Sequence, residues 1–350
     1  MPDNKSNNSL PNFKFDLENA PGGWNGPGGT AKQHTIDNFP VAQSIAAVSM
    51  RLEPGALREL HWHSIAAEWA YVISGHCRIT VYSPDGQCEI SDLGPGDIWY
   101  FPRGHAHSIQ GLQPDVCHFL LVFDNGHFSE FGTSSITDWI TQIPANILTQ
   151  DLGANAQKIK DKAKGEAYIV TGPAPPKIVV PLNPKIQTSQ LLHTYRLGAA
   201  PFIKFDSGTE QLASSKEFPI STTLTGVILR LQPGALREMH WHPNADEWQY
   251  YISGQSEVGI FASNGRTRTD QFAPGQVAFV NQGFGHYIKQ MGDEETVILI
   301  VLNSGVYEEI SLSGWIASNP EQLLATNFGV DESTIQSLPK AARFIAASKK

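Results

Sequence analysis

The chain has 350 residues, and its 25 Lys and Arg against 34 Asp and Glu give a formal net charge of −9. Such an acidic chain repels a phosphate backbone, and no local basic patch offsets this, so we expect no nucleic-acid partner. No apolar run approaches the ~20 residues that a membrane-spanning helix needs, so we expect no membrane partner either. Charged residues make up only 17% of the chain, and 31 Gly and 23 Pro accompany them, which favours many short strands joined by turns. The length favours two domains.

The first forty residues carry little hydrophobic periodicity, and we expect residues 1–40 to form an extended N-terminal arm. Residues 1–12 lack the apolar core of a signal peptide, which predicts a cytoplasmic location. A periplasmic or secreted location stays open if the chain was trimmed from a longer precursor. The three cysteines, Cys77, Cys88 and Cys117, are odd in number and form no CxxC pair. A disulfide framework is therefore not expected.

The rest of the chain is organised by a tandem duplication. Residues 54–63 read PGALRELHWH and residues 233–242 read PGALREMHWH, which is an offset of 179. The same offset relates four further pairs: Glu68 and Glu247, Gly75 and Gly254, Gly96 and Gly275, and His107 and His286. The predicted domains are a first repeat over 41–150, a linker with the start of the second repeat over 151–215, and a second repeat over 216–350.

Each copy reads as short strands between Gly and Pro turns. In chain order the expected strands lie within 68–82, 94–102, 118–123, 247–261, 273–280 and 296–302, where aromatic and β-branched residues concentrate. Helical signals are confined to 135–149, 313–326 and 331–346, where Ser or Thr caps precede apolar spacing. The prolines of 150–200 mark an extended linker. The prediction is an all-β protein made of two small barrels or sandwiches with short helical extensions.

Metal-ligating residues recur at the same spacing in both copies. His61 and His63 are two residues apart, so on a strand both imidazoles point to one face. Glu68 and His107 complete a set of three imidazoles and one carboxylate, and the second copy repeats the set with His240, His242, Glu247 and His286. These ligand types suit Mn, Fe, Zn, Ni or Cu, and the hard carboxylate favours an octahedral ion. We therefore predict two metal sites.

These residues resemble the two cupin motifs. The pattern G-x5-H-x-H-x4-E-x6-G is met by Gly55, His61, His63, Glu68 and Gly75, and G-x5-P-x-G-x2-H is met by Gly96, Pro102, Gly104 and His107. The second copy meets the first motif in full and has Asn281 in place of the proline of the second motif. The resemblance implies two tandem cupin barrels, that is, double-stranded β-helix or jelly-roll domains.

The stretches AEWAYVISG, GDIWYFPRGHAHSIQ and LLVFDNGHFSE resemble, more narrowly, the bicupin oxalate decarboxylases. This resemblance implies a carboxy-lyase that cleaves oxalate to formate and CO2, with two Mn²⁺ ions per chain and dioxygen as a cofactor. It also implies a homo-oligomer, a trimer or a hexamer.

Three residues beside the predicted ligands are candidates for handling the substrate. Arg58 and Arg237 each precede the first ligand histidine by three residues and could hold an oxalate carboxylate. Strict alternation would place Arg58 on the face opposite His61, so we expect the preceding glycine turn to redirect it. The alternative is an exposed Arg58 paired with Glu59. The family resemblance makes Glu130, in a lid over 124–135, the proton donor; the alternative is a solvated loop glutamate.

The lid departs from the family pattern, because Ser129-Glu130-Phe131-Gly132 stands where the family has Ser-Glu-Asn-Ser. The second copy is three residues shorter here, and apolar Ile300 occupies the position of the family's second acid. We therefore expect chemistry at the first site and a second site without a proton donor. Three alternatives stay open: an oxalate oxidase giving CO2 and hydrogen peroxide, a bicupin dioxygenase acting on another substrate, and a non-catalytic manganese-binding bicupin.

Overall fold

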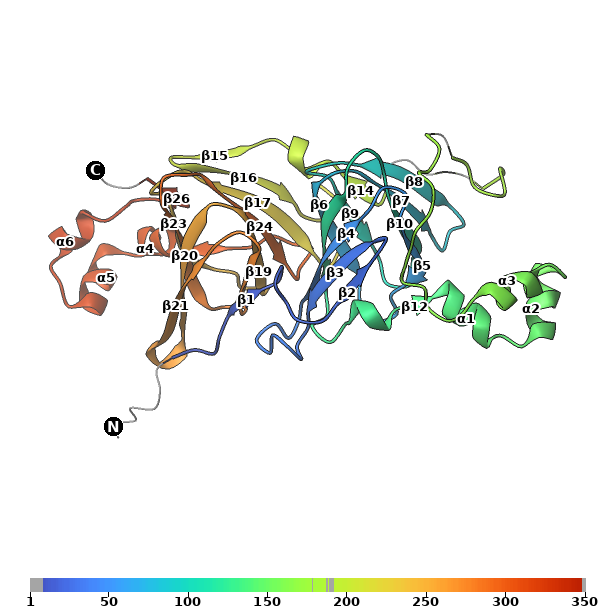
Figure 1. Cartoon of the computed structure of the whole chain (residues 1–350). Coiled ribbons are helices and arrows are strands. Elements are labelled where there is room, and N and C mark those ends of the chain that lie inside the picture. The colour runs from blue at the N-terminus through green and yellow to red at the C-terminus, as the bar shows by residue number, and fades with distance from the viewer. Residues whose placement is uncertain (1–8, 178, 187, 189–191, 348–350) are drawn as a thin grey trace. The chain divides into compact units, whose positions relative to one another are not determined.

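The structure is a computed structural model that describes residues 9–177, 179–186, 188 and 192–347. These residues form two compact units. The N-terminal unit comprises residues 17–199 with 218–221, and the C-terminal unit comprises the described residues up to 16, residues 200–217 and those from 222 onward. Each unit is built from two antiparallel sheets (Figure 1). The predicted all-β class with two tandem domains is therefore confirmed.

The N-terminal unit pairs a seven-stranded sheet with a smaller one. The larger sheet has the spatial order β14 (Thr194–Tyr195), β9 (Ile98–Phe101), β6 (Glu68–Ser74), β11 (Cys117–Phe123), β4 (Ala46–Leu52), β3 (Gly29–His34) and β2 (Trp24–Gly26). The smaller sheet has the order β12 (Ser134–Ser135), β5 (Leu57–Trp62), β10 (Ala106–Gly111), β7 (Cys77–Tyr82) and β8 (Cys88–Leu93), with β13 (Ile169–Val170) also paired to β5.

The C-terminal unit repeats this topology strand for strand. Its larger sheet has the order β1 (Lys14–Asp16), β22 (Gln276–Val280), β19 (Glu247–Ser253), β24 (Thr296–Leu302), β17 (Thr225–Leu231), β16 (Gly208–Ala213) and β15 (Ile203–Phe205). Its smaller sheet, read in the same direction as that of the N-terminal unit, has the order β25 (Ile310–Ser311), β18 (Leu236–Trp241), β23 (Gly285–Met291), β20 (Gln255–Ala262) and β21 (Arg266–Phe272), with β26 (Ile345–Ala346) also paired to β18.

The core of each unit follows from the composition of these strands. β11 (CHFLLVF) and β24 (TVILIVL) lie in the middle of their sheets and are almost entirely buried, as their unbroken apolar runs require. β5 and β18, by contrast, have one exposed residue each, Leu60 and Met239, among buried polar ones. The polar residues that face inward on β5 and β18 are those of the predicted metal sites.

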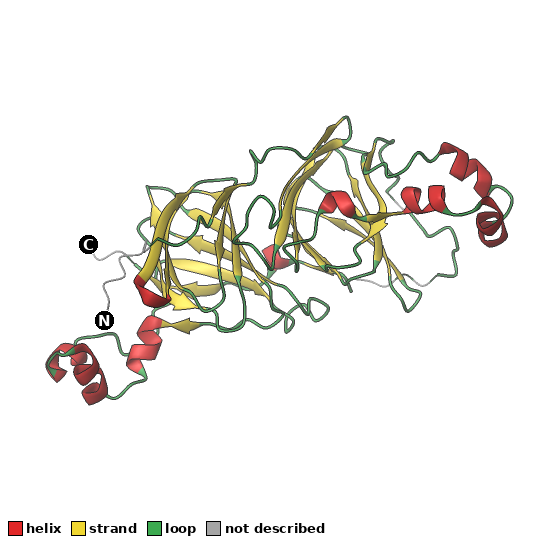
Figure 2. Ribbon diagram, turned by 90° about the horizontal axis from the view of Figure 1, so that it is seen from below, coloured by secondary structure: helices red, strands yellow, loops and turns green. Residues whose placement is uncertain are grey.

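The helices form a separate group in each unit (Figure 2). They are α1 (Ile136–Gln142), α2 (Ala145–Leu152) and α3 (Ala156–Lys162), then α4 (Leu312–Ala317), α5 (Glu321–Phe328) and α6 (Glu332–Gln336). Ser135 and Ser311 cap α1 and α4 by accepting a backbone N–H through the side chain. The predicted helices over 135–149 and 313–326 are each split, because Pro144 and Pro320 cannot continue a helix and instead begin α2 and α5.

The structure adds strand pairing and a helix to the two segments that the sequence predicts as extended. Among the described residues before 41, β3 pairs with β4 over its full length and β1 pairs with β22. Among the described residues of 150–200, α3 forms a helix and β14 joins the larger sheet beside β9. Sequence periodicity missed β3 and β14 because both are short and mix small, polar and aromatic residues.

Candidate metal centres and active site

The four predicted ligands of the first copy converge. His61 lies on β5 directly opposite His107 on β10, His63 follows β5, and Glu68 begins β6. One ligand atom from each residue lies within 4.8 Å of all the others, and all four residues are buried. The second set, His240, His242, Glu247 and His286, meets the same condition. The i, i+2 spacing of two histidines and the antiparallel pairing of β5 with β10, or of β18 with β23, therefore bring each set together.

The rings of the first centre are oriented as metal ligands require. Nδ1 of His61 lies 2.6 Å from the carbonyl oxygen of Glu59, and Nδ1 of His107 lies 2.8 Å from that of His105. A ring that donates its Nδ1–H to a carbonyl keeps Nε2 as the lone-pair atom. Nε2 of both rings is buried without a hydrogen-bond partner among the described residues. Two orphaned imidazole nitrogens beside a buried carboxylate fit a bound cation.

The electrostatics of the first centre agree with that fit. Burial by itself raises the pKa of the Glu68 carboxyl, but His107 and His63 outweigh burial and hold this pKa well below its usual range. Burial lowers the pKa of His61 well below its ordinary value. Oε1 of Glu68 also accepts a hydrogen bond of 2.7 Å from the indole of Trp99. Neutral imidazoles and an ionised carboxylate are the forms in which these groups bind a metal.

The C-terminal centre repeats these supports. Nδ1 of His240 lies 2.7 Å from the carbonyl oxygen of Glu238, two residues earlier, as in the first copy. Glu247 accepts a hydrogen bond of 2.7 Å from Gln249, which takes the part of Trp99. Burial and the nearby charge of Arg237 lower the pKa of His240 well below its ordinary value. Both centres therefore fit a divalent cation with imidazole and carboxylate ligands.

A β-bulge places Arg58 beside the first centre. His61 of β5 pairs with His107 of β10, and Arg58 of β5 pairs with Ile109 of β10. Arg58 is three residues from His61, whereas Ile109 is only two residues from His107, so β5 has one extra residue here. The extra residue reverses the alternation, and Arg58 is buried on the same side as His61. β18 and β23 show the same register shift before His240. The bulge, and not the glycine turn that we expected, redirects the arginine.

Arg58 forms a buried ion pair with Glu130. Its Nε lies 2.7 Å from Oε1 of Glu130, and both side chains have no exposed surface. The guanidinium also donates to the carbonyl of Tyr168 at 3.2 Å and to Oγ1 of Thr133 at 2.9 Å, and it lies over the Tyr168 ring. Oε2 of Glu130 is buried and has no hydrogen-bond partner among the described residues. Arg58 is therefore not an exposed partner of Glu59, and Glu130 is not solvated.

The segment that carries Glu130 is fastened at both ends. Ser129 caps the short 3-10 helix Glu130–Gly132, and Gln33 of β3 donates to Oγ of Ser129 at 3.0 Å. Oε1 of Gln33 also accepts the backbone N–H of Glu130 at 3.2 Å. The ring of Phe131 packs 5.3 Å from that of Tyr168. The segment is thus held against the barrel with its carboxylate inside.

The C-terminal centre holds more carboxylates than the sequence indicated. Arg237 contacts Glu309, and its Nε lies 3.2 Å from Oε1 of Glu210 on β16. The hydroxyl of Tyr307 donates to Oε2 of Glu309 at 2.8 Å. Burial lowers the pKa of Arg237, but Glu210, Tyr307 and Glu309 outweigh burial and raise it. The C-terminal centre therefore holds two acids paired with Arg237, and the apolar Ile300 lines the same space.

Sequence reasoning missed Gln33, Tyr168 and Glu210. Gln33 and Glu210 lie on β3 and β16, which were not among the predicted strands and carry no recognised motif. Aligning the two repeats at the 179-residue offset would have marked both positions, since it aligns Gln33 with Leu212 and Glu210 with Ala31. A polar residue in one copy opposite an apolar residue in the other marks a position where the two sites differ.

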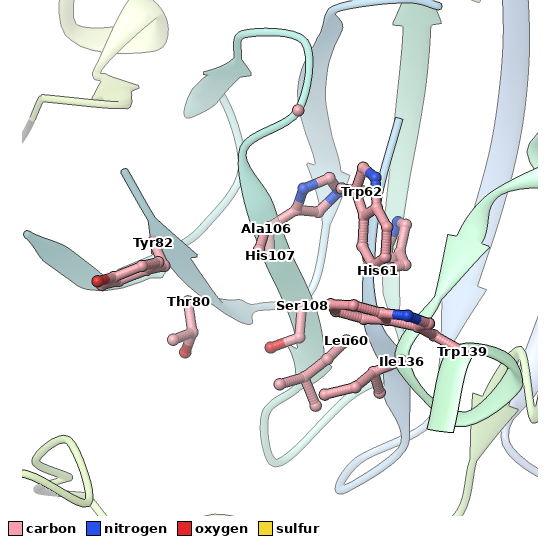
Figure 3. A pocket seen from close by; sticks show the side chains of 11 residues that line it. Leu60, His61, Trp62, Thr80, Tyr82, Ala106, His107, Ser108, Ile136 and Trp139 are labelled. Carbon is pink, nitrogen blue, oxygen red and sulfur yellow. The ribbon is translucent and has the colours of Figure 1, made fainter. Parts of the chain in front are cut away.

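The outer face of the smaller sheet carries apolar side chains next to the first centre. Trp62 lies between the two ligand histidines in sequence but points away from them, and its ring packs 5.5 Å from that of Trp139 (Figure 3). Leu60, Tyr82 and Trp139 are each about half exposed on this face. They line a pocket that His61 and His107 reach from the other side.

Comparison with known proteins agrees with this architecture. The Cupin family model matches residues 16–160 and 197–336. Oxalate decarboxylase OxdC of Bacillus subtilis (strain 168) is 38% identical over 326 residues, which cover 92% of this chain and 83% of that protein. The chain belongs to the bicupin oxalate decarboxylase family. A probable oxalate decarboxylase of Arthroderma benhamiae is 33% identical over 91% of this chain and 80% of its own length.

A solved structure of the Bacillus subtilis oxalate decarboxylase, described as having Mn(II) centres, superposes with a TM-score of 0.90 at 36% identity. The match covers 97% of this chain and 90% of that one. The two metal centres described above thus belong to a bicupin oxalate decarboxylase fold. None of the helices that the structure describes is long and apolar enough to cross a membrane. Cys77, Cys88 and Cys117 are buried free thiols.

Proposed function

We propose that the protein is a manganese-dependent oxalate decarboxylase that cleaves oxalate to formate and CO2, with dioxygen as a cofactor and with the chemistry at the N-terminal centre. The observation that carries this proposal is the buried pair of Arg58 and Glu130 beside the His61, His63, Glu68 and His107 group. Family membership and the Mn(II) centres of the Bacillus protein support the choice of substrate and metal.

Each residue of the pair has a distinct task. Manganese with dioxygen would supply the one-electron chemistry that weakens the C–C bond of oxalate. Arg58, a buried cation, holds a carboxylate of the substrate and neutralises its charge. Once oxalate has replaced it on Arg58, the Glu130 carboxylate takes up a proton from solvent and then delivers that proton to the carbon that has lost CO2, which returns Glu130 to the carboxylate. Oε2 of Glu130, which is buried and has no hydrogen-bond partner among the described residues, is the oxygen available for this proton. The fully buried state of both side chains keeps water from competing for that step.

The lid over 124–135 has to open for oxalate to enter, because in the closed state the Glu130 carboxylate is bound to the Arg58 guanidinium that would hold the substrate. Opening has to break the contacts that hold the closed lid, which are the hydrogen bonds of Gln33 to Ser129 and Glu130 and the packing of Phe131 on Tyr168. None of these contacts belongs to a sheet, so the lid can open while the barrel stays intact.

The second candidate is an oxalate oxidase that gives CO2 and hydrogen peroxide. Phe131 and Gly132 favour it, because they replace the last two residues of the family lid. Glu130 argues against it, since an oxidase needs no proton donor at this place. A non-catalytic manganese-binding bicupin is the third candidate.

One assay separates these functions. Manganese-loaded protein is incubated with oxalate in air, and formate and hydrogen peroxide are measured together with the metal content. Formate as the main product supports the decarboxylase. Peroxide with little formate supports the oxidase, and neither product, with two manganese ions bound per chain, rejects both.

We also propose that the protein is a homo-oligomer, a trimer or a hexamer. The exposed apolar face with Leu60, Tyr82 and Trp139 supports this, because a contiguous apolar face of this kind is typical of a subunit interface. The molar mass in solution tests the proposal, and a mass of 38.3 kDa for the active species would refute it.

A further inference from the structure

The two repeats differ at one inward-facing position of the larger sheet. β3 and β16 align at the 179-residue offset as GTAKQH and GTEQLA, so Ala31 and Glu210 occupy equivalent places. Ala31 is fully buried in the core of the N-terminal unit. Glu210 is also buried, with 7% of its surface exposed, and it lines the space around the C-terminal ligands. The second barrel thus carries a buried carboxylate where the first has an alanine.

Glu210 takes the place on Arg237 that Glu130 takes on Arg58. Oε1 of Glu210 lies 3.2 Å from Nε of Arg237, and Oε1 of Glu130 lies 2.7 Å from Nε of Arg58. The remaining donors of Arg237 face the carbonyl of Phe344 and the carboxylate of Glu309. The donor edges of this guanidinium are therefore already filled by groups of the chain itself.

The two carboxylates differ in how they are attached. Glu130 sits in a short 3-10 turn outside the sheets, held by the contacts of Gln33 and Phe131, so its movement away from Arg58 breaks no strand pairing. Glu210 sits in β16, which pairs with β15 on one side and with β17 on the other. A strand bonded on both sides cannot swing its side chain out of the barrel without breaking the sheet. Arg58 thus loses its closest carboxylate when the turn moves and keeps only Glu166 at 3.7 Å, whereas Arg237 keeps Glu210.

The small free space and the negative charge at the C-terminal centre also disfavour the binding of a dicarboxylate. The free volume among Glu210, Arg237, Tyr307 and the ligands is about 10 Å³, which is room for about one water molecule. Glu210 and Glu309 both contact the Arg237 guanidinium, and the ligand Glu247 lines the same space. A dicarboxylate entering this space would meet three like charges and no unoccupied cationic side chain.

We propose that Glu210 is a built-in anion that occupies Arg237 and closes the C-terminal centre to oxalate and other small dicarboxylates. The inference rests on the proposed function only for the choice of oxalate as the probe. It makes Glu210 the residue that determines which of the two centres binds substrate. The C-terminal centre then holds its cation without taking part in the chemistry.

The test is the number of oxalate ions bound per chain, measured by calorimetric titration of manganese-loaded protein without oxygen. We expect one oxalate per chain for the unchanged protein and two for Glu210→Ala, which recreates the residue of the first copy. Glu210→Gln removes the charge but keeps the size of the side chain, so the space stays filled and this variant should still bind one. Glu295→Gln, at an acid that is half exposed beside Arg230, is the matched control and should bind one.

Manganese content of two per chain in every variant shows that the centres are intact. Two oxalate ions bound by the unchanged protein would overturn the inference, and so would no added binding in Glu210→Ala. If the unchanged protein binds one oxalate but forms no formate, the proposed function fails and the inference stands. If the unchanged protein binds no oxalate while Glu210→Ala binds one, the proposed function again fails and the inference again stands.

Discussion

The contact of Gln33 with the lid gives the most specific prediction. Gln33 accepts the N–H of Glu130 at 3.2 Å and donates to Ser129 at 3.0 Å, and it is the β3 side chain with hydrogen bonds to this part of the lid. The second copy has Leu212 at the equivalent position. Gln33→Leu therefore removes both hydrogen bonds with a residue that the fold accepts at this place in the other barrel.

The expected magnitude follows from these two contacts. A neutral hydrogen bond contributes about 0.5–1.5 kcal/mol net, so the two together favour the closed lid by about 1–3 kcal/mol. That range corresponds to a factor of about 5–150 in the ratio of closed to open lid. The pair of Arg58 and Glu130 remains in the variant, so the lid still closes but is open more often.

Backbone hydrogen exchange of a peptide spanning the lid over 124–135 measures this change directly. We expect its exchange to be faster by a factor within that range, and we expect less formate and more peroxide per oxalate consumed. Lys32→Gln is the matched control, because Lys32 bonds the carbonyls of Ala20 and Gly22 and not the lid. Exchange and product ratio both unchanged in Gln33→Leu would refute the proposed positioning of Glu130 by Gln33.

Further predictions concern stability. Glu130→Ala leaves the Arg58 guanidinium buried without its closest carboxylate, so urea unfolding should show a loss of about 3 kcal/mol, and a loss below 1 kcal/mol would contradict a buried pair. Glu18 contacts Ser49, Arg51 and His118, and despite burial these partners lower its pKa from 4.5 to about 2. Since its folded pKa is the lower one, Glu18 stabilises the fold by at most about 3 kcal/mol above pH 4.5. The gap in stability between the unchanged protein and Glu18→Gln should shrink as the pH falls from 4.5 to 2, and a pH-independent gap would argue against this. Removing metal with a chelator should lower the melting temperature and adding Mn²⁺ should restore it, because an ion bound only to the folded state stabilises that state; an unchanged melting temperature would contradict the metal centres.

The ligand sets could be predicted from the sequence because strand geometry alone brings them together. Two histidines at i and i+2 share a face of any strand, and the duplicated spacing removes chance as an explanation. The strands themselves were also predictable, since runs such as HFLLVF and TVILIVL suit the middle of a sheet buried on both faces.

The position of Arg58 could not be predicted, because it depends on pairing between strands. The bulge is defined by the two points where β5 meets β10, and a single strand carries no record of its partner's register. The same limit applies to Tyr168, whose backbone carbonyl and ring contact Arg58 from a segment 110 residues further along the chain.

Glu210 illustrates a different limit. A glutamate in GTEQLA resembles an exposed strand residue, and only its burial against Arg237 shows otherwise. Comparison of the two repeats would have marked the position, since Ala31 is apolar. Internal duplication thus supplies the contrast that a single copy lacks.

The central claim is that Glu130 at the N-terminal centre delivers the proton that turns oxalate into formate. Glu130→Gln keeps the size of the side chain and a hydrogen-bond acceptor for Arg58 but removes the acid. Glu308→Gln, at an exposed acid in the corresponding segment of the second repeat, is the control. Simultaneous measurement of formate and peroxide should show formate production lowered by about 10²–10⁴-fold in Glu130→Gln alone, with peroxide still formed. Formate production by Glu130→Gln at the rate of the unchanged protein would contradict the claim.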